Sequence, residues 1–209
     1  MEEINVERMS QEYFDILKEL GNIGAGNATT ALAQMLQCKV DMKVPQVQLL
    51  EFKEVGEMVG GAEQQMTAIY LGVEGEITGS IMFLMDMTTA KHLVSKMLMG
   101  MGSNRGIGGF TEMELSALLE IGNIIAGSYL NSLSDLTRLT IYPTIPSIAT
   151  DMAGAILSVP AIEFGVYGDK LLLIQTQFSD EIELNGYFIL VPDVDSYSKM
   201  LASLGIISQ

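Results

Sequence analysis

The sequence predicts an α+β (α/β) fold of two pseudo-symmetric halves that share one sheet, each half with a long helix, about three antiparallel strands and a second helix. The first observation behind this prediction is an internal repeat. The segment at 17–26 (LKELGNIGAG) returns 101 residues later at 118–127 (LLEIGNIIAG), and the same shift relates Pro45 to Pro146. The second observation is a short turn at 74–76 between two strand-like segments, which is typical of antiparallel pairing.

The third observation is that the two halves end alike. Strand-like segments that begin at Gly79 and at Gly186 are each followed by a helical pattern. This shift is 107 residues, so the second half holds about six extra residues before its last strand. We therefore predict a single domain over 1–209, made of fused repeats at about 10–100 and 111–205.

Apolar periodicity and turn residues define the elements in chain order. In the first half we expect a helix, a strand, a short helical or irregular stretch, two strands and a helix, at 10–36, 40–51, 52–59, 66–73, 79–86 and 88–99. In the second half we expect the same order, at 111–136, 139–147, a short helix after 151, 170–178, 186–191 and 193–204. The glycine-rich connector at 100–109 follows a helix and not a strand, so we interpret it as a linker and not as a dinucleotide-binding loop.

Composition limits the function. The chain of 209 residues is 48% hydrophobic and 18% charged, which argues against disorder. Its net charge of −15 argues against a nucleic-acid partner. Cys38 and His92 are the only residues of their types, so a zinc site or a Cys–His nucleophile is not expected. We predict no metal site of its own. No signal-like or membrane-spanning segment is present, so we expect a cytoplasmic protein without membrane insertion.

One stripe of residues on each long helix carries the candidate site. The positions have offsets of 0, 4, 7 and 11, which fall within about 60° of each other at roughly 100° per residue. The stripe residues are Asp15, Glu19, Asn22 and Gly26 in the first copy, and Ser116, Glu120, Asn123 and Gly127 in the second. Apolar residues on the other side of the first helix, which we expect to face the core, are Ile16, Leu17, Leu20 and Ile23.

Glycines inside these helices require an explanation, because each costs about 1 kcal/mol relative to alanine. Gly26 and Gly127 lie on the stripe, where a missing side chain would let another backbone approach. Gly21 and Gly122 lie to the side and fit helix packing. An exposed Glu and Asn on a helix are ordinarily solvated residues with no specific function. The run GNIGAG does not form a phosphate-binding loop either, because no Gly-Lys-Ser/Thr follows it. Retention of the stripe in both copies, while core neighbours changed, favours a functional interpretation.

The spacing Asp/Ser, three residues, Glu, two residues, Asn, twenty-two residues, Pro resembles the motif of the CheC, CheX and FliY family of CheY-phosphate phosphatases. Both copies satisfy it, and the similarity extends over essentially the whole chain. Two copies in one chain that ends at Gln209, without room for a flagellar-switch domain, favour the CheC-like branch. Gly24 and Asn27 become Ile125 and Ser128 in the second copy, so the two sites need not be equally active.

The resemblance implies an enzyme, a hydrolase that acts on phosphorylated CheY. The aspartyl phosphate is already activated and carries Mg²⁺ on the substrate protein, so the phosphatase would need no cofactor or nucleophile of its own. The resemblance implies that Asn22 and Asn123 orient the water. It also implies that Glu19 and Glu120 pair with a lysine of the regulator. A general-base role for the glutamates is the less favoured alternative. Docking positions are Asp15, Gly26, Ser116 and Gly127, while Pro45 and Pro146 would be structural.

A second partner that the resemblance implies is the receptor deamidase CheD, and the alternative function is a non-catalytic adaptor or regulator of CheD. Asp151 has no acidic counterpart at Leu50, one repeat earlier, so it is our candidate for a CheD-binding residue. The simpler interpretation of Asp151 is an N-cap of the short helix that follows it. We expect a monomer when the chain is alone.

Overall fold

The computed structural model describes residues 11–99, 109–164, 170–179 and 183–205. The helices are α1 (Gln11–Leu36), α2 (Phe52–Met58), α3 (Met87–Met97), α4 (Glu112–Thr137), α5 (Ala153–Phe164) and α6 (Val194–Ser203). The strands are β1 (Asp41–Glu51), β2 (Gln65–Gly75), β3 (Gly79–Asp86), β4 (Ile141–Pro143), β5 (Ser147–Met152), β6 (Lys170–Ser179) and β7 (Glu183–Pro192). Apart from Gly109, the predicted connector lies outside the described residues.

The strands form one antiparallel seven-stranded sheet in the described part of the chain, as the sequence predicts. Its order is β1-β6-β7-β3-β2-β4, and β5 also pairs with β2. Strands β4 and β5 together correspond to the first strand of the second half, so β6 is its second strand and β7 its third. The third strands of the two halves, β3 and β7, pair at the centre of the sheet. The first strand of each half pairs with the second strand of the other half, which leaves β1 and β4–β5 as the two edges.

The pairing register shows the pseudo-two-fold relation directly. Glu51 of β1 lies opposite Lys170 of β6. Met152, which is 101 residues after Glu51, lies opposite Gln65 of β2. Neither half could complete its own sheet without the other, so the two copies fold as one interlocked unit.

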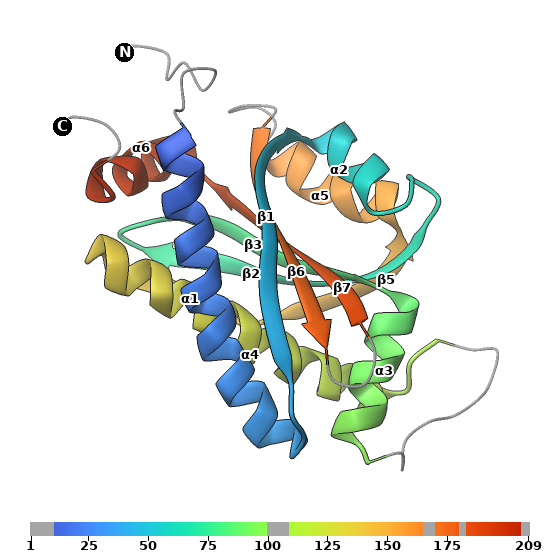
Figure 1. The fold of residues 1–209 in the computed structure, drawn as a ribbon. Coiled ribbons are helices and arrows are strands. Elements are labelled where there is room, and N and C mark those ends of the chain that lie inside the picture. The colour runs from blue at the N-terminus through green and yellow to red at the C-terminus, as the bar shows by residue number, and fades with distance from the viewer. Residues whose placement is uncertain (1–10, 100–108, 165–169, 180–182, 206–209) are drawn as a thin grey trace.

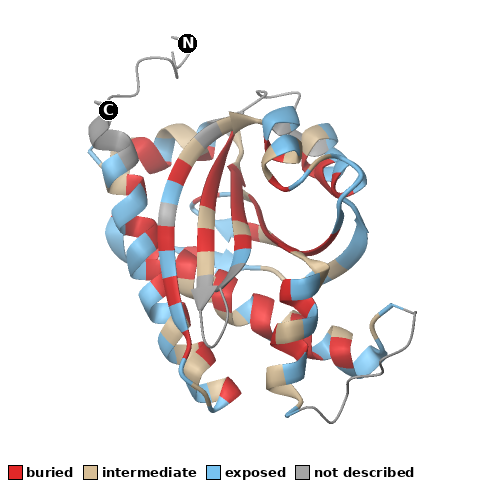
Figure 2. Cartoon of the chain, turned by 45° about the vertical axis from the view of Figure 1, so that its right-hand side comes forward, coloured by how far each residue is buried: buried red, intermediate tan, exposed pale blue. Residues whose placement is uncertain are grey.

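Helices cover both faces of the sheet (Figure 1). Helices α1 and α4, joined by apolar residues of α3 and α6, pack on one face, whereas α2 and α5 pack on the other. Strand β6 shows why both faces are apolar. Leu172 and Ile174 point into the first core, and Leu171 and Leu173 point into the second. Figure 2 shows the resulting contrast between the buried central strands and the exposed outer side of α1.

The strand predicted at 139–147 is the main departure from the expected elements. The chain forms two shorter strands there, with a break at 144–146 that ends at Pro146. Proline has no N–H group to donate to a sheet ladder. The copy in the first half, Pro45, lies where the β1–β6 register shifts between Lys43 and Gln46. The repeated proline thus lies at an irregularity of the first strand of each half, a register shift within β1 and a break between β4 and β5.

In the described ranges, no helix is both long and apolar enough to cross a membrane.

Candidate functional site

The two predicted stripes lie on α1 and α4, on the outer side of the helix layer. Seven of the eight stripe residues are exposed, and Gly127 is half-buried. The first of the stripes comprises Asp15, Glu19, Asn22 and Gly26, and the second comprises Ser116, Glu120, Asn123 and Gly127. The polar side chains are therefore available to a partner protein, and the condition for a docking surface is met in both copies.

The opposite side of each helix is held by apolar contacts with the sheet. Leu17 and Leu20 of α1 are 2% and 3% exposed. Ile121 and Ile125 of α4 are fully buried. The prediction that Ile23 faces the core is wrong, because this side chain is 38% exposed. Ile23 lies at the border between the buried arc and the stripe, roughly 80° from Asp15 around the helix.

Two of the repeated glycines serve helix packing, as predicted. A Cβ atom on Gly122 would lie 2.5 Å from Cδ1 and 2.6 Å from Cγ2 of Ile69 in β2. A Cβ atom on Gly21 would lie 3.2 Å from Cγ1 of Val44 in β1 and 3.3 Å from Cγ2 of Ile174 in β6. These glycines let both long helices approach the sheet closely.

Helices α1 and α4 contact each other at a third glycine. A Cβ atom on Gly24 would lie 2.8 Å from the ring of Tyr129, which stacks on Phe188 with a centroid separation of 4.2 Å. The Tyr129 hydroxyl shares a hydrogen bond of 3.2 Å with Thr176, and burial raises the pKa of Tyr129 to about 12. Tyr129 is therefore a neutral packing residue at this contact.

This contact explains the departures between the two copies. Gly24 is replaced by the fully buried Ile125, which is part of the same core as Tyr129. Nδ2 of Asn27 donates a hydrogen bond of 3.2 Å to Oγ of Ser132, so Asn27 links α1 to α4. Ser128, its counterpart, donates instead to the Ile124 carbonyl in its own helix. Both substitutions lie at helix packing positions and outside the stripes.

The stripe glycines have no such packing role. A Cβ atom on Gly26 or Gly127 would meet no atom within 4 Å. Within the fold these positions could hold alanine, which is the better helix former by about 1 kcal/mol. The bare patches are therefore not explained by packing within the described part of the chain.

Alanine substitutions should separate the two kinds of glycine. We expect Gly122→Ala to destabilise the protein by about 1–3 kcal/mol, because the added methyl overlaps Ile69. We expect Gly26→Ala to stabilise it by about 1 kcal/mol, because the methyl meets only solvent. Urea denaturation of both variants measures the difference. Equal destabilisation by the two changes would show that Gly26 is also needed for folding.

A second surface, which we call the neutral face, comprises β4, β5 and α5. Residues 138–164, up to the end of α5, contain three charged residues, Arg138, Asp151 and Glu163, whereas the equivalent positions 37–63 contain eight. The eight are Lys39, Asp41, Lys43, Glu51, Lys53, Glu54, Glu57 and Glu63. The exposed large apolar residues of the neutral face are Tyr142, Ile145, Met152, Val159 and Ile162. None of the described side chains at 37–63 belongs to this class.

Asp151 lies on the neutral face, but it does not cap the helix. It is an exposed residue of β5 opposite Met66, and its Oδ1 accepts a hydrogen bond of 2.7 Å from the backbone N–H of Met152. Helix α5 begins at Ala153, whose N–H donates to the Gln64 carbonyl. The predicted N-cap is therefore wrong, because the strand continues one residue beyond Asp151.

Asp151 is the residue of this face that was predicted from the sequence, whereas its exposed apolar residues were not predicted. The signal that could have found them is the loss of charge between repeats, since solvated surfaces normally keep their charged residues. Exposed apolar patches of this kind are typical of protein–protein contact surfaces. In the described part of the chain, no cluster of three or more His, Cys, Asp or Glu side chains is arranged to hold a metal ion.

Comparisons with known proteins place these features in a family. The CheC-like family matches residues 14–49 and 113–149, which contain both stripes and both repeated prolines. The chain is 38% identical over 200 residues to the CheY-P phosphatase CheC of Bacillus subtilis, a match that covers 94% of this chain and 96% of that relative.

Two solved structures show the same fold. FliY of Thermotoga maritima superposes with a TM-score of 0.75 at 22% identity, covering 95% of this chain and 98% of the other. The CheX–CheY–BeF₃–Mg²⁺ complex of Borrelia burgdorferi contains a chain that superposes with a TM-score of 0.52 at 17% identity, covering 81% and 96%.

Proposed function

Because the chain belongs to the CheC-like family, we propose that it is a phosphatase that hydrolyses the aspartyl phosphate of the response regulator CheY. The relative named as a CheY-P phosphatase aligns with nearly the whole chain, and both copies of the stripe lie within the family match. The observation that carries the proposal is that both stripes are exposed while the opposite side of each helix is packed on the sheet. As part of the proposal, the chain is a cytoplasmic protein that is monomeric without its partners.

The reaction assigned to the stripe requires that the attacking water molecule is positioned, and it requires no covalent intermediate on the phosphatase. An acyl phosphate is already a reactive substrate, so the phosphatase has to hold a water molecule in line with the phosphorus. A carboxamide suits this task, because it offers both an acceptor oxygen and a donor N–H₂ group. Asn22 and Asn123 supply the carboxamides in the two sites.

The glutamates are assigned to docking. Glu19 lies one helical turn from Asn22, and Glu120 lies one turn from Asn123, so each carboxylate can pair with a lysine beside the phosphoaspartate while the amide reaches the phosphoryl group. Asp15 and Ser116 extend the docking surface, and Gly26 and Gly127 leave room for the backbone of the regulator. Mg²⁺ is supplied by the substrate protein, and this chain contributes no cofactor.

Release of radiolabelled phosphate from CheY tests the proposal. The wild-type chain should accelerate release from phosphorylated CheY in proportion to its concentration, both with and without CheD. A wild-type chain that binds CheD and leaves the release rate unchanged would show that the adaptor function is correct instead.

A second proposed function, binding of CheD, is favoured by the neutral face. Its low charge and exposed apolar side chains differ sharply from the equivalent surface of the first half. The stripes are present twice, whereas this surface is present once, so a single partner could bind there without blocking either site. Asp151 is an acidic residue that this surface has gained relative to its copy, where Leu50 stands.

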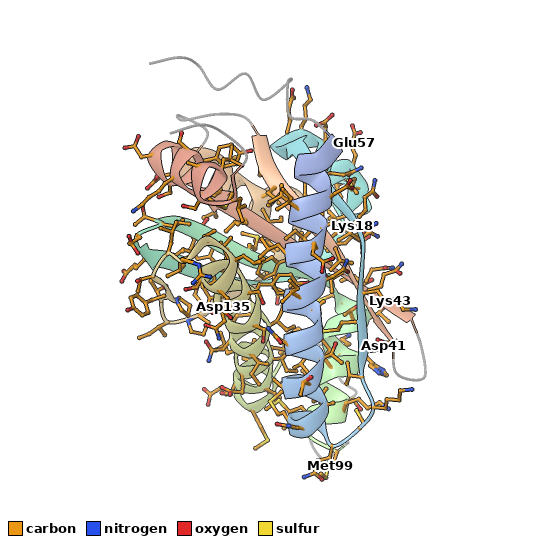
Figure 3. The ribbon with its side chains drawn as sticks, turned by 60° about the vertical axis from the view of Figure 1, so that its left-hand side comes forward. Lys18, Asp41, Lys43, Glu57, Met99 and Asp135 are labelled. Carbon is orange, nitrogen blue, oxygen red and sulfur yellow. The ribbon has the colours of Figure 1, made fainter. Side chains whose placement is uncertain are left out.

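Asp151→Lys is expected to weaken CheD binding by about tenfold, with basal phosphatase activity nearly intact. A cation held within the proposed apolar contact would be desolvated and unpaired. The matched control is Asp41→Lys, which makes the same charge change on β1, the other edge strand (Figure 3). Calorimetric titration with CheD measures both. Equal CheD affinity in wild type and Asp151→Lys would rule out this residue as part of the contact.

A further inference from the structure

The stripe of α1, taken together with the residue on its border, differs from that of α4 by one compensated pair of charges. Next to Glu19, the first copy carries Asp15 and Lys18, both exposed. At the equivalent positions the second copy carries Ser116 and Leu119. An acidic and a basic residue have thus been exchanged for two neutral residues. Residues 15–26 carry a net charge of −1, because Lys18 offsets Asp15 and Glu19 remains. Residues 116–127 also carry a net charge of −1, which comes from Glu120.

Helix geometry makes Asp15 and Lys18 neighbours. Residues three and four positions apart lie next to each other on a helix surface, with about 5–6 Å between their Cβ atoms. Lys18 is three residues from Asp15 and four from Asn22, so it lies along the border of the stripe. Figure 3 shows Lys18 on the outside of α1. Leu119, the counterpart of Lys18, is partly buried and packs against the core, so this position contributes to packing in α4.

We infer that Lys18 adjusts how strongly the α1 site binds its substrate, by offsetting the charge of Asp15 so that residues 15–26 and 116–127 each present one net negative charge to the docking lysine of CheY. The inference rests on the proposed function. A lysine that approaches Glu19 comes within roughly 10 Å of Asp15 and Lys18, and at this range exposed charges still interact at low salt. Asp15 attracts the incoming cation and Lys18 repels it.

Substitutions that turn the first stripe into the second test the inference. Glu120→Lys serves as the background, because it confines docking to α1. The ligand is CheY activated with beryllofluoride and Mg²⁺, and fluorescence titration gives the Kd. We expect Lys18→Leu to tighten binding by roughly two- to fivefold and Asp15→Ser to weaken it by a similar factor. The double variant Asp15→Ser with Lys18→Leu should return to within about twofold of the background.

A matched control removes an equal charge elsewhere in the same half. Lys43 is an exposed residue of β1, and its counterpart one repeat later is Thr144. Lys43→Thr should change the Kd less than Lys18→Leu does. The effects of Lys18→Leu and Asp15→Ser should both shrink when the salt concentration is raised, because screening weakens charge interactions and leaves packing unaffected.

Two results would overturn the inference. Unchanged or weaker binding by Lys18→Leu, while the background still binds activated CheY, would show that Lys18 does not oppose the docking lysine. Absence of binding by the background itself, and by the wild type, would contradict the proposed function and the inference together.

Discussion

Replacing both Asn22 and Asn123 with alanine should nearly abolish the acceleration of CheY dephosphorylation. Loss of the groups that position a reactant can lower a rate on the order of 10²-fold. Each single substitution should lower the rate, because it inactivates one of the two sites and leaves the other intact. Radiolabelled phosphate release under single-turnover conditions, with the chain in excess over CheY, measures the effect.

The asparagine variants should retain their fold and their docking. Both asparagines are exposed, and surface substitutions of this kind change stability by about 0.5 kcal/mol or less. Activated CheY should therefore bind the double variant with nearly wild-type affinity, because Glu19 and Glu120 are still present. Wild-type phosphate release by the double variant would refute the role of the carboxamides.

Replacing both Glu19 and Glu120 with lysine should remove docking itself. The incoming lysine of CheY would then meet a like charge in both sites, and loss of a close interfacial charge pair typically lowers affinity on the order of 10²-fold. Both residues are exposed, so the fold should tolerate the change. Titration with beryllofluoride-activated CheY measures the affinity. Undiminished affinity would show that the regulator binds a different surface.

Glutamine at the same two positions distinguishes docking from proton transfer. If the carboxylates dock, Glu19→Gln with Glu120→Gln should weaken binding while the rate at saturating enzyme concentration is retained. If a carboxylate acts as general base, the saturating rate should fall and binding should be retained. Docking is the role assigned in the proposal, and the two outcomes decide between it and proton transfer.

The repeat in the sequence predicts much of this fold. Identical spacing in two segments implies two similar units, and the alternating apolar pattern places most helices and strands within a few residues. The exchange of strands between halves could not be predicted, because periodicity within β1 does not reveal that its partner is β6. That choice depends on long-range packing, which local patterns do not encode.

The errors at individual residues have similar causes. Ile23 was predicted to face the core from its position opposite the stripe, but it lies at the border of the buried arc of α1 and is 38% exposed. Asp151 was expected to cap a helix because its residue type favours that position, but pairing with β2 extends the strand beyond it. The outward direction of the stripes was predictable, since four offsets on one helix fix a common side regardless of what packs behind it.

The central claim is that the stripes on α1 and α4 are the surfaces that contact phosphorylated CheY. A crystal structure of this chain with CheY, beryllofluoride and Mg²⁺ tests it most directly. The account predicts that CheY lies on α1, on α4 or on both, with Glu19 or Glu120 paired to a lysine. The carboxamide of Asn22 or Asn123 should lie about 3 Å, a hydrogen-bond distance, from a water molecule in line for attack on the phosphorus position. A complex in which CheY binds the neutral face and leaves both stripes uncovered would contradict it.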